Sequence, residues 1–286
     1  MSKRAKKSGE KRPKVRDIFV PRPFAGLKSE VEWVALRELV PAASAPLKLK
    51  PEFAVEGRDV ILATVLPMAW PAMTKPDGRV FVALQRHVQS GDISRDIAVA
   101  ILRGLETAPG QPVAVPALPG EGPRLQDILA DEPLDVTVHA GFEFWLDSDV
   151  NDPSVTAGVE RANEAIYPTT ALDAAEGAYW CQVVEKSHVR WVLGDDEDRA
   201  LDALSRLSAG QQLLLGEGTK FAGMFRAHGT LVPVWDVPLD PPASEWEQPL
   251  AEFAKRYAEA YAVAADLTTA ERQAKQGLQA RQLTLR

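Results

Sequence analysis

The residues best suited to acid–base chemistry are His139 and Glu143, four positions apart in a stretch typical of a strand. A strand places both on one face, about 13 Å apart, which is too far to share a metal ion or a proton. We therefore expect His139 to be a partly buried, hydrogen-bonded residue. His228 stands in another strand-like stretch, so neighbouring strands could still assemble a site. An enzyme hypothesis rests on His139, Glu143 and His228 as candidate catalytic residues.

Motifs for metals and cofactors are incomplete in this chain. No histidine has a second histidine two to four positions away, so spacing suggests no paired metal ligands. Residues 147–152, DSDVND, begin like a calcium loop, but Asp152 and Gly158 replace the glycine and glutamate that such a loop needs. Residues 216–223, GEGTKFAG, lack the spacing of a nucleotide-binding loop. A solvated loop and a turn are the simpler interpretations, and we predict neither a metal nor a cofactor.

The sole cysteine, Cys181, excludes an intramolecular disulfide and a multi-cysteine zinc site. Free cysteines are commonly buried and unreactive, so a structural role is favoured over a nucleophilic one. This cysteine content favours a reducing cytoplasm. No apolar run approaches the roughly 20 residues needed to span a bilayer, so we expect no membrane partner.

The strongest chemical signal is a basic segment at the N-terminus. The whole chain has a net charge of −7, whereas residues 1–16 contain eight basic residues and one acidic residue, Glu10. The segment is therefore +7, and the other 270 residues carry −14. This division of charge is typical of an arm that binds phosphate or another acidic surface. The predicted nucleic-acid-binding residues are Lys3, Arg4, Lys6, Lys7, Lys11, Arg12, Lys14 and Arg16.

Other roles fit this segment less well. No apolar stretch follows the basic residues, which argues against a secretory signal, and a transit peptide would be amphipathic. Residues 1–16 have too few apolar groups to offset the entropy of ordering, so we predict a disordered arm. The remaining alternative is a tail that only improves solubility. Four apolar residues are expected to pin the following segment to the body: Ile18, Phe19, Val20 and Phe24.

Helical patterns occur along the whole chain. Asp92 and Asp152 are suited to cap two of them, and Pro153 is suited to a first helical position. The predicted helices span residues 30–39, 92–105, 125–130, 153–167, 196–208, 246–264 and 269–283.

Strand patterns fill the intervals between these helices. Apolar runs at 59–66 and 79–85 flank the turn residues of MTKPDG, which predicts an antiparallel hairpin. A second hairpin is predicted from residues 178–185 and 188–193. Further strands are predicted over 134–146 and 213–238.

These elements predict an α+β fold with mixed or mainly antiparallel sheets. Each half of the chain has a hairpin, a helix, a short apolar segment and a long strand. A true duplication and a chance likeness between two α+β halves both stay open. The predicted organisation is a basic arm at 1–16, a first half at 17–153, a second half at 154–267 and a polar C-terminal helix or tail at 268–286.

The segment from Arg22 to Leu47, RPFAGLKSEVEWVALRELVPAASAPL, resembles an uncharacterised family of high-GC Gram-positive bacteria. The likeness extends from about Phe24 to Leu267. Some family members carry labels of a type II topoisomerase or of the SecA translocase motor, but this chain has neither a P-loop nor the cysteines of a zinc module. The resemblance implies a cytoplasmic bacterial protein and assigns no role to any residue.

Three functions are consistent with these features. The favoured hypothesis is a non-enzymatic binding or adaptor protein whose basic arm contacts RNA, the ribosome or DNA, while its acidic body recognises a protein partner. The first alternative is the enzyme built on His139, Glu143 and His228. The second is a protein–protein module whose basic tail is incidental.

Overall fold

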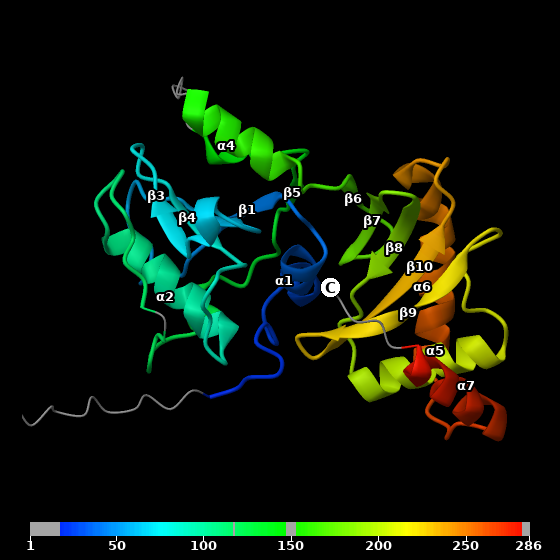
Figure 1. Ribbon diagram of the computed structural model, residues 1–286. Coiled ribbons are helices and arrows are strands. Elements are labelled where there is room, and N and C mark those ends of the chain that lie inside the picture. Colours follow the sequence, from blue (N-terminus) through cyan, green and yellow to red (C-terminus); the bar gives the residue numbers. More distant parts are fainter. Residues whose placement is uncertain (1–17, 117, 147–152, 282–286) are drawn as a thin grey trace, which may run out of the picture.

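Two five-stranded β-sheets flank helix α1 (Glu30–Glu38) in the part of the chain that the structure describes (Figure 1). The structure is a computed structural model, and it describes residues 18–116, 118–146 and 153–281. One pair of strands in the first sheet runs parallel, whereas all neighbours in the second sheet are antiparallel. The predicted α+β class with mixed or antiparallel sheets is confirmed.

The first sheet has the strand order β3-β4-β2-β1-β5, and the second has the order β6-β7-β8-β10-β9. The strands of the first sheet are β1 (Ala43–Leu47), β2 (Val60–Ala63), β3 (Ala72–Thr74), β4 (Val80–Ala83) and β5 (Thr137–Val138). The strands of the second sheet are β6 (Thr169–Ala171), β7 (Ala178–Val183), β8 (Lys186–Trp191), β9 (Lys220–Ala227) and β10 (Thr230–Val237). The other helices are α2 (Ile93–Glu106), α3 (Leu125–Ile128), α4 (Pro153–Asn163), α5 (Glu197–Ala209), α6 (Glu247–Tyr261) and α7 (Thr269–Ala280). Short 3₁₀ helices are η1 (Pro67–Ala69), η2 (Glu143–Trp145) and η3 (Ala243–Trp246).

Helix α2 packs against the first sheet and confirms the helix predicted over 92–105. Asp92 caps it as expected, accepting a hydrogen bond from the Arg95 backbone N–H at 3.4 Å. Gly104 lies so close to Val80 of β4 that a Cβ atom there would stand 2.3 Å from a Val80 methyl carbon. Glycine at this position therefore lets the helix approach the sheet closely.

The antiparallel hairpin predicted from residues 59–66 and 79–85 is wrong. β2 and β4 do fall in those segments, but they run parallel. The antiparallel partner of β4 is β3, a strand of three residues that the chain forms after η1. The predicted turn itself is present, since the Lys75 backbone N–H donates to the Arg79 carbonyl oxygen at 2.8 Å. A pattern of two long apolar runs did not reveal the short strand between them.

The long strand predicted over 134–146 is also wrong, because only β5 forms there and η2 follows it. Phe142 and Trp145 stack with 4.1 Å between their ring centroids, inside a small buried cluster. The Trp145 indole N–H donates to the Val65 carbonyl oxygen at 3.0 Å. In a strand, residues three positions apart point to opposite faces, so burying both rings together requires the turn.

The second sheet confirms the hairpin predicted within residues 178–193, which the structure forms as β7 and β8. β9 and β10 make a longer hairpin inside the predicted strand region 213–238. Helices α5 and α6 cover the face that carries Trp235, whose ring lies 4.9 Å from that of Phe253 in α6. The two sheets differ in strand order and in pairing pattern.

Helix α4 begins at Pro153 as predicted but ends at Asn163, so the predicted extension to Tyr167 is wrong. The Tyr167 hydroxyl instead donates to the Leu39 carbonyl oxygen at 3.1 Å, which directs the chain towards α1. The predicted cap, Asp152, lies outside the described residues.

Helix α1 joins the two sheets into one core (Figure 1). Trp33 and Leu36 are buried in a cluster that contains Val82 of the first sheet and Val232 of the second. Residues 33–37 are all buried, so the helix is enclosed on more than one face.

Polar contacts hold α1 to the second sheet. Glu32 accepts hydrogen bonds from the Gly177 backbone N–H at 2.7 Å and from the Tyr179 hydroxyl at 2.5 Å. Gly177 has a φ of 75°, and a Cβ atom there would lie 2.8 Å from Val31, so only glycine suits this contact. Burial raises the pKa of Glu32, although both hydrogen bonds act in the opposite direction.

The segment before α1 is anchored by only some of the predicted residues. Phe24 is fully buried, and the Val20 backbone N–H donates to the Gly91 carbonyl oxygen at 2.8 Å. Ile18 and Phe19 are 58% and 77% exposed, so the expectation that they pin the chain is wrong. Among residues 18–24, the side chain of Phe24 and the backbone of Val20 therefore anchor the chain, the latter beside the start of α2.

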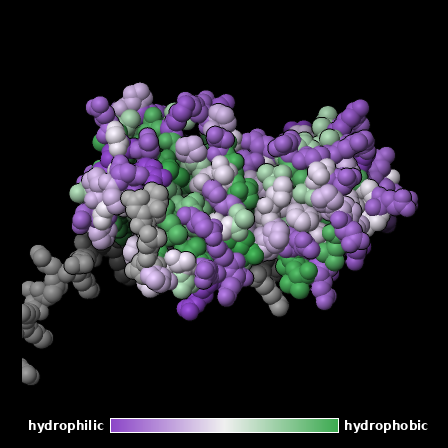
Figure 2. Space-filling view, turned by 90° about the horizontal axis from the view of Figure 1, so that it is seen from above, coloured by the Kyte–Doolittle hydropathy of each residue, from purple (hydrophilic) through white to green (hydrophobic). Residues whose placement is uncertain are grey.

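The surface seen from above mixes hydrophilic and hydrophobic side chains, with hydrophilic ones prominent at its rim (Figure 2). Within the described ranges, no helix has both the length and the apolar character needed to cross a membrane.

The variant Trp33→Ala should lower the free energy of unfolding by about 3–5 kcal/mol, because it opens a cavity in the core that both sheets share. Urea denaturation followed by circular dichroism measures the change. Trp70→Ala is the matched control, since Trp70 is 46% exposed and its removal should cost less than about 1 kcal/mol. Equal effects of the two variants would contradict the shared core.

The variant Glu32→Gln should remove a pH dependence of stability. The folded state raises the pKa of Glu32, which means that it favours the protonated carboxyl group. The contribution of this group to the free energy of unfolding is therefore complete below the unfolded-state pKa of about 4.3, and it is lost as the pH rises through the folded-state pKa. The wild-type protein should therefore lose stability relative to the variant as the pH increases. Urea denaturation at several pH values tests this, and a constant difference would refute it.

Candidate functional site in a polar pocket between the sheets

A polar pocket lies between the two sheets, at the C-terminal end of α1. Its volume is about 560 Å³, which falls in the range of small-molecule sites. Segments from both halves of the chain line it, and Val183 is its single apolar lining residue among those described. The polar lining residues are Arg37, Glu38, Gln85, Arg86, Gln89, Tyr167 and Arg190.

Arg37 is held by several hydrogen bonds at one side of the pocket. It lies in the last turn of α1 and is 9% exposed. Its guanidinium donates to the Leu84 carbonyl oxygen and to the Gln89 side-chain oxygen. Burial lowers the pKa of Arg37, whereas the negative charge of Glu38 raises it. Like-charge repulsion from Arg86 lowers this pKa further. Arg37 thus ties α1 to the loop that follows β4.

Arg86 stands in that loop and pairs with Asp96 of α2, with 2.9 Å between Nη2 and Oδ1. The two side chains are only 6% and 1% exposed. Burial raises the pKa of Asp96, although the Ser90 backbone N–H and Arg86 both favour its ionised form. Arg86 Nε has no hydrogen-bond partner among the residues that the structure describes. Arg86 Nη2, although it lies in the ion pair, also makes no hydrogen bond to the described residues, so the guanidinium keeps two buried donors beside the pocket.

Arg190 of β8 lines the pocket from the second sheet. Its Nη1 lies 3.4 Å from the Tyr167 hydroxyl oxygen, and its guanidinium carbon lies 5.7 Å from the Tyr167 ring centroid. No carboxylate of the described ranges forms an ion pair with Arg190. The lining side chains thus carry three positive charges against one negative charge, that of Glu38.

His228, a candidate from the sequence, lies beside this pocket. It occupies the turn between β9 and β10 with a φ of 49°, and its Nε2 is 2.7 Å from Glu38 Oε1. Arg37 Nε lies 3.1 Å from the same nitrogen. Burial alone would raise the pKa of Glu38, but His228 and Arg37 outweigh it and lower that pKa. His228 therefore orients Glu38 at the edge of the pocket.

His139 and Glu143, the other two candidates, have different partners. His139 Nε2 is 2.8 Å from Ser44 Oγ, and the imidazole stacks on Phe144 with 4.4 Å between centroids. His139 lines a separate cavity of about 580 Å³. Burial lowers the pKa of His139, while Glu143 acts in the opposite direction. The Glu143 carboxylate accepts a hydrogen bond from Asn163 Nδ2 at 2.7 Å.

The predicted strand face shared by His139 and Glu143 is wrong, because a 3₁₀ turn begins at Glu143. The expected hydrogen bond of His139 is confirmed by its contact with Ser44. Sequence spacing could not reveal that partner, because Ser44 lies 95 residues away along the chain. Only the pairing of β1 with β5 brings the two together.

A row of reactive side chains across the second sheet was also missed. The strand register places Cys181 opposite His188, and His188 opposite Asp236. His188 Nδ1 lies 3.0 Å from Asp236 Oδ1. Cys181 is 1% exposed and forms no disulfide, so the predicted buried free cysteine is confirmed. Burial raises the pKa of Cys181, which keeps the thiol protonated. Placing a two-residue turn directly after Val183 in the sequence would have predicted that Cys181 lies opposite His188.

The remaining motifs contribute little to a site. The eight basic residues of the predicted arm and the loop at 147–152 lie outside the described residues. Residues 216–219 form a turn before β9, where Thr219 Oγ1 donates to the Gly216 carbonyl oxygen at 2.7 Å. In the described part of the chain, no group of three or more His, Cys, Asp and Glu residues is placed to hold a metal ion.

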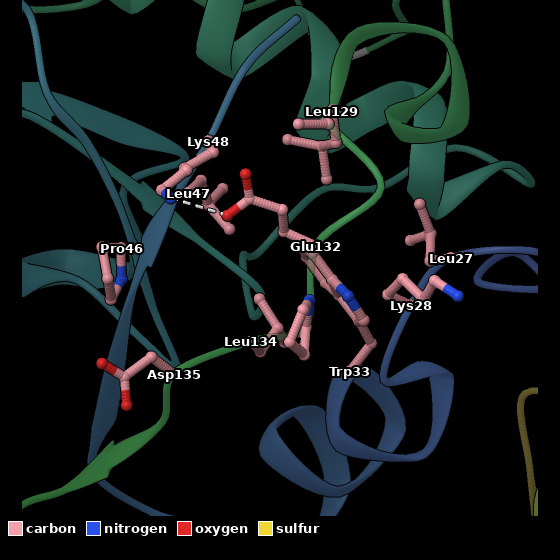
Figure 3. Close-up of a pocket in the computed structure, with 12 residues that line it drawn as sticks. Leu27, Lys28, Trp33, Pro46, Leu47, Lys48, Leu129, Glu132, Leu134 and Asp135 are labelled. Carbon is pink, nitrogen blue, oxygen red and sulfur yellow. Dashed lines mark ion pairs between the residues drawn. The ribbon is translucent and has the colours of Figure 1, made fainter.

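A smaller cavity, of about 220 Å³, lies beside Trp33 (Figure 3). Lys48 and Glu132 form an ion pair at its wall, with 2.7 Å between Nζ and Oε2. Lys28, another lining residue, pairs with Asp131 at 3.8 Å. Because the lysines of this cavity already have carboxylate partners, the pocket between the sheets is the better candidate for a charged ligand.

Comparison with known protein families matches residues 23–286 to a family of unknown function, DUF5926. The chain belongs to this family. The match confirms the predicted membership of an uncharacterised family, while the Gram-positive origin stays a prediction. No curated protein and no solved structure matches the chain. The pocket lies wholly within the DUF5926 match, whereas the basic segment 1–16 precedes it.

Removing Asp96 should destabilise this DUF5926 member strongly. Asp96→Ala leaves Arg86 buried without its counter-charge and should lower the free energy of unfolding by about 3–5 kcal/mol. Glu106→Ala is the matched control on the same helix, because it breaks an exposed pair with Arg103 and should cost less than about 1 kcal/mol. Combining Asp96→Ala with Arg86→Leu should recover part of the stability. Similar urea midpoints for Asp96→Ala and Glu106→Ala would contradict a buried pair.

Proposed function

We propose that the protein is a non-enzymatic binding or adaptor protein whose basic N-terminal arm contacts RNA, the ribosome or DNA. The observation that carries the proposal is the charge division, +7 on residues 1–16 and −14 on the rest of the chain. Eight cations within sixteen residues suit salt-dependent, sequence-tolerant binding to phosphates. The acidic body repels nucleic acid at long range, so the arm is the part that makes this contact.

The contacts at the start of the described chain support an arm that acts from a defined point on the body. Val20 is hydrogen-bonded to Gly91, and Arg22 Nε lies 2.6 Å from Glu30 Oε1. A cationic segment attached at this point keeps any phosphate that it binds close to the folded body. That proximity raises the effective concentration of a second partner at the body, as an adaptor requires.

The acidic body is then the part that recognises a protein partner. Its net charge of −14 favours a partner with a basic surface. A cytoplasmic location is consistent with the single, buried and free thiol of Cys181.

An enzyme is the second candidate function, and the contact between Ser44 Oγ and His139 Nε2 favours it. Their distance of 2.8 Å suits a nucleophile and its general base. A serine-reactive fluorophosphonate probe should then label the wild-type protein but not Ser44→Ala. Absence of labelling at Ser44 would exclude this nucleophile.

Deletion of the basic arm should weaken RNA binding at least about tenfold at low salt, because most of the cations available to phosphates are removed. The measurement compares the full-length protein with a chain that begins at Asp17, by fluorescence anisotropy with a labelled single-stranded RNA. The salt dependence of binding should also fall, by about 0.7 in log–log slope for each phosphate that the shortened chain no longer neutralises.

A variant with all eight basic residues of the arm changed to glutamine separates the effect of charge from that of chain length. It should bind as weakly as the shortened chain. Equal RNA affinity of the full-length and shortened proteins would contradict the proposal.

A further inference from the structure

The pocket between the sheets has an unusual charge pattern for a partly enclosed cavity. Arg37, Arg86 and Arg190 reach it from α1, from the loop after β4 and from β8. Glu38 is the single acidic residue among the described residues that line it, and that carboxylate is shared with His228. An excess of positive charge therefore faces the cavity.

Two of the three arginines, Arg86 and Arg190, lack part of the hydrogen bonds or ion pairs that a guanidinium group can form with the described residues. Arg86 Nε is buried and lacks a hydrogen-bond partner among the described residues, and Arg190 forms no ion pair with any of their carboxylates. The long contact from Arg190 to the Tyr167 hydroxyl, at 3.4 Å, involves a neutral group. Asp96 supplies a counter-charge to Arg86, but a buried guanidinium N–H without a hydrogen-bond acceptor still costs free energy, which an anionic acceptor in the cavity would recover.

Repulsion among the arginines has the same consequence. After burial, which is the largest influence on Arg37, the nearby charge of Arg86 further lowers the pKa of Arg37. Glu38 and Asp96 act in the opposite direction, but they do not outweigh burial and Arg86. A ligand with negative charge would relieve the repulsion between guanidinium groups that the fold brings together.

We propose that this pocket binds the phosphate group of a small molecule, with Arg86 and Arg190 as its direct ligands. Guanidinium groups form charge-assisted, bidentate hydrogen bonds with phosphate oxygens. Arg86 lies in the loop after β4 and Arg190 lies in β8, so a tetrahedral oxyanion can meet both, whereas a planar carboxylate offers its oxygens in one plane. The cavity volume of about 560 Å³ leaves room for the rest of the ligand.

The phosphate has two sources that the geometry alone does not separate. One is a free phosphorylated small molecule, and the other is a nucleic acid held by the arm. The arm joins the body close to the pocket, because Val20 bonds to Gly91 and the lining residue Gln89 lies two positions earlier. The inference goes beyond the proposed arm function, since its site lies in the folded body, and the experiment distinguishes the two sources.

Isothermal titration calorimetry of the full-length protein with inorganic phosphate and with adenosine monophosphate tests the site. The wild-type protein and the exposed control Arg103→Gln should bind both. Arg190→Gln should bind at least about tenfold more weakly, because one of two direct ligands is removed. The double variant Arg86→Gln with Asp96→Asn should bind as weakly, and it neutralises the buried pair without stranding a charge. Circular dichroism confirms that each variant is folded.

The chain that begins at Asp17 separates the pocket from the arm. Unchanged affinity of this chain for both phosphate ligands supports a small-molecule site in the body. Equal phosphate affinity of the wild-type protein and Arg190→Gln would overturn the proposal, as would the absence of binding to either ligand. Binding of single-stranded RNA alone, abolished when residues 1–16 are removed, would support the arm and overturn the pocket.

Discussion

The enclosure of helix α1 between the two sheets is the constraint on which the rest of the structure depends. Trp33 fills a core to which both sheets contribute, and Glu32 accepts a hydrogen bond from the backbone of Gly177, directly before β7 of the second sheet. The same helix ends with Arg37 and Glu38, so its packing sets where these charges lie. The polar pocket consequently exists only while both sheets are docked on α1. The loop after β4 completes its wall, and hydrogen bonds from Arg37 of α1 hold that loop in place.

The sequence predicted elements whose signals are local. Asp92 and the apolar stripe after it define α2, and the hairpin within residues 178–193 follows from two short apolar runs around a tight turn. Predictions failed where distant contacts decide the path. β3 is too short to show a pattern of its own, and joint burial of Phe142 and Trp145 replaces a strand with a turn. In both cases tertiary packing overrides the local preference for an extended chain.

The candidate site was harder to predict than the fold. Arg37, Arg86 and Arg190 come from three distant segments, and each resembles an ordinary surface cation when read in the sequence alone. The counter-charge of Arg86, Asp96, belongs to a helix whose sequence pattern is dominated by its apolar stripe. His228 was a candidate for catalysis, yet its observed contact orients Glu38. Spacing can reveal partners across one hairpin, but it cannot reveal groups that meet only when two sheets dock.

The central claim is that docking both sheets on α1 creates an arginine pocket in the body that receives an anionic group. Hydrogen–deuterium exchange of the full-length protein, with and without inorganic phosphate, tests this claim most directly because it reports on each segment separately. The account predicts slower exchange in residues 84–91, at the C-terminal end of α1 and in β8 when phosphate is present. Unchanged exchange in these segments at saturating phosphate, or protection confined to other parts of the chain, would contradict it.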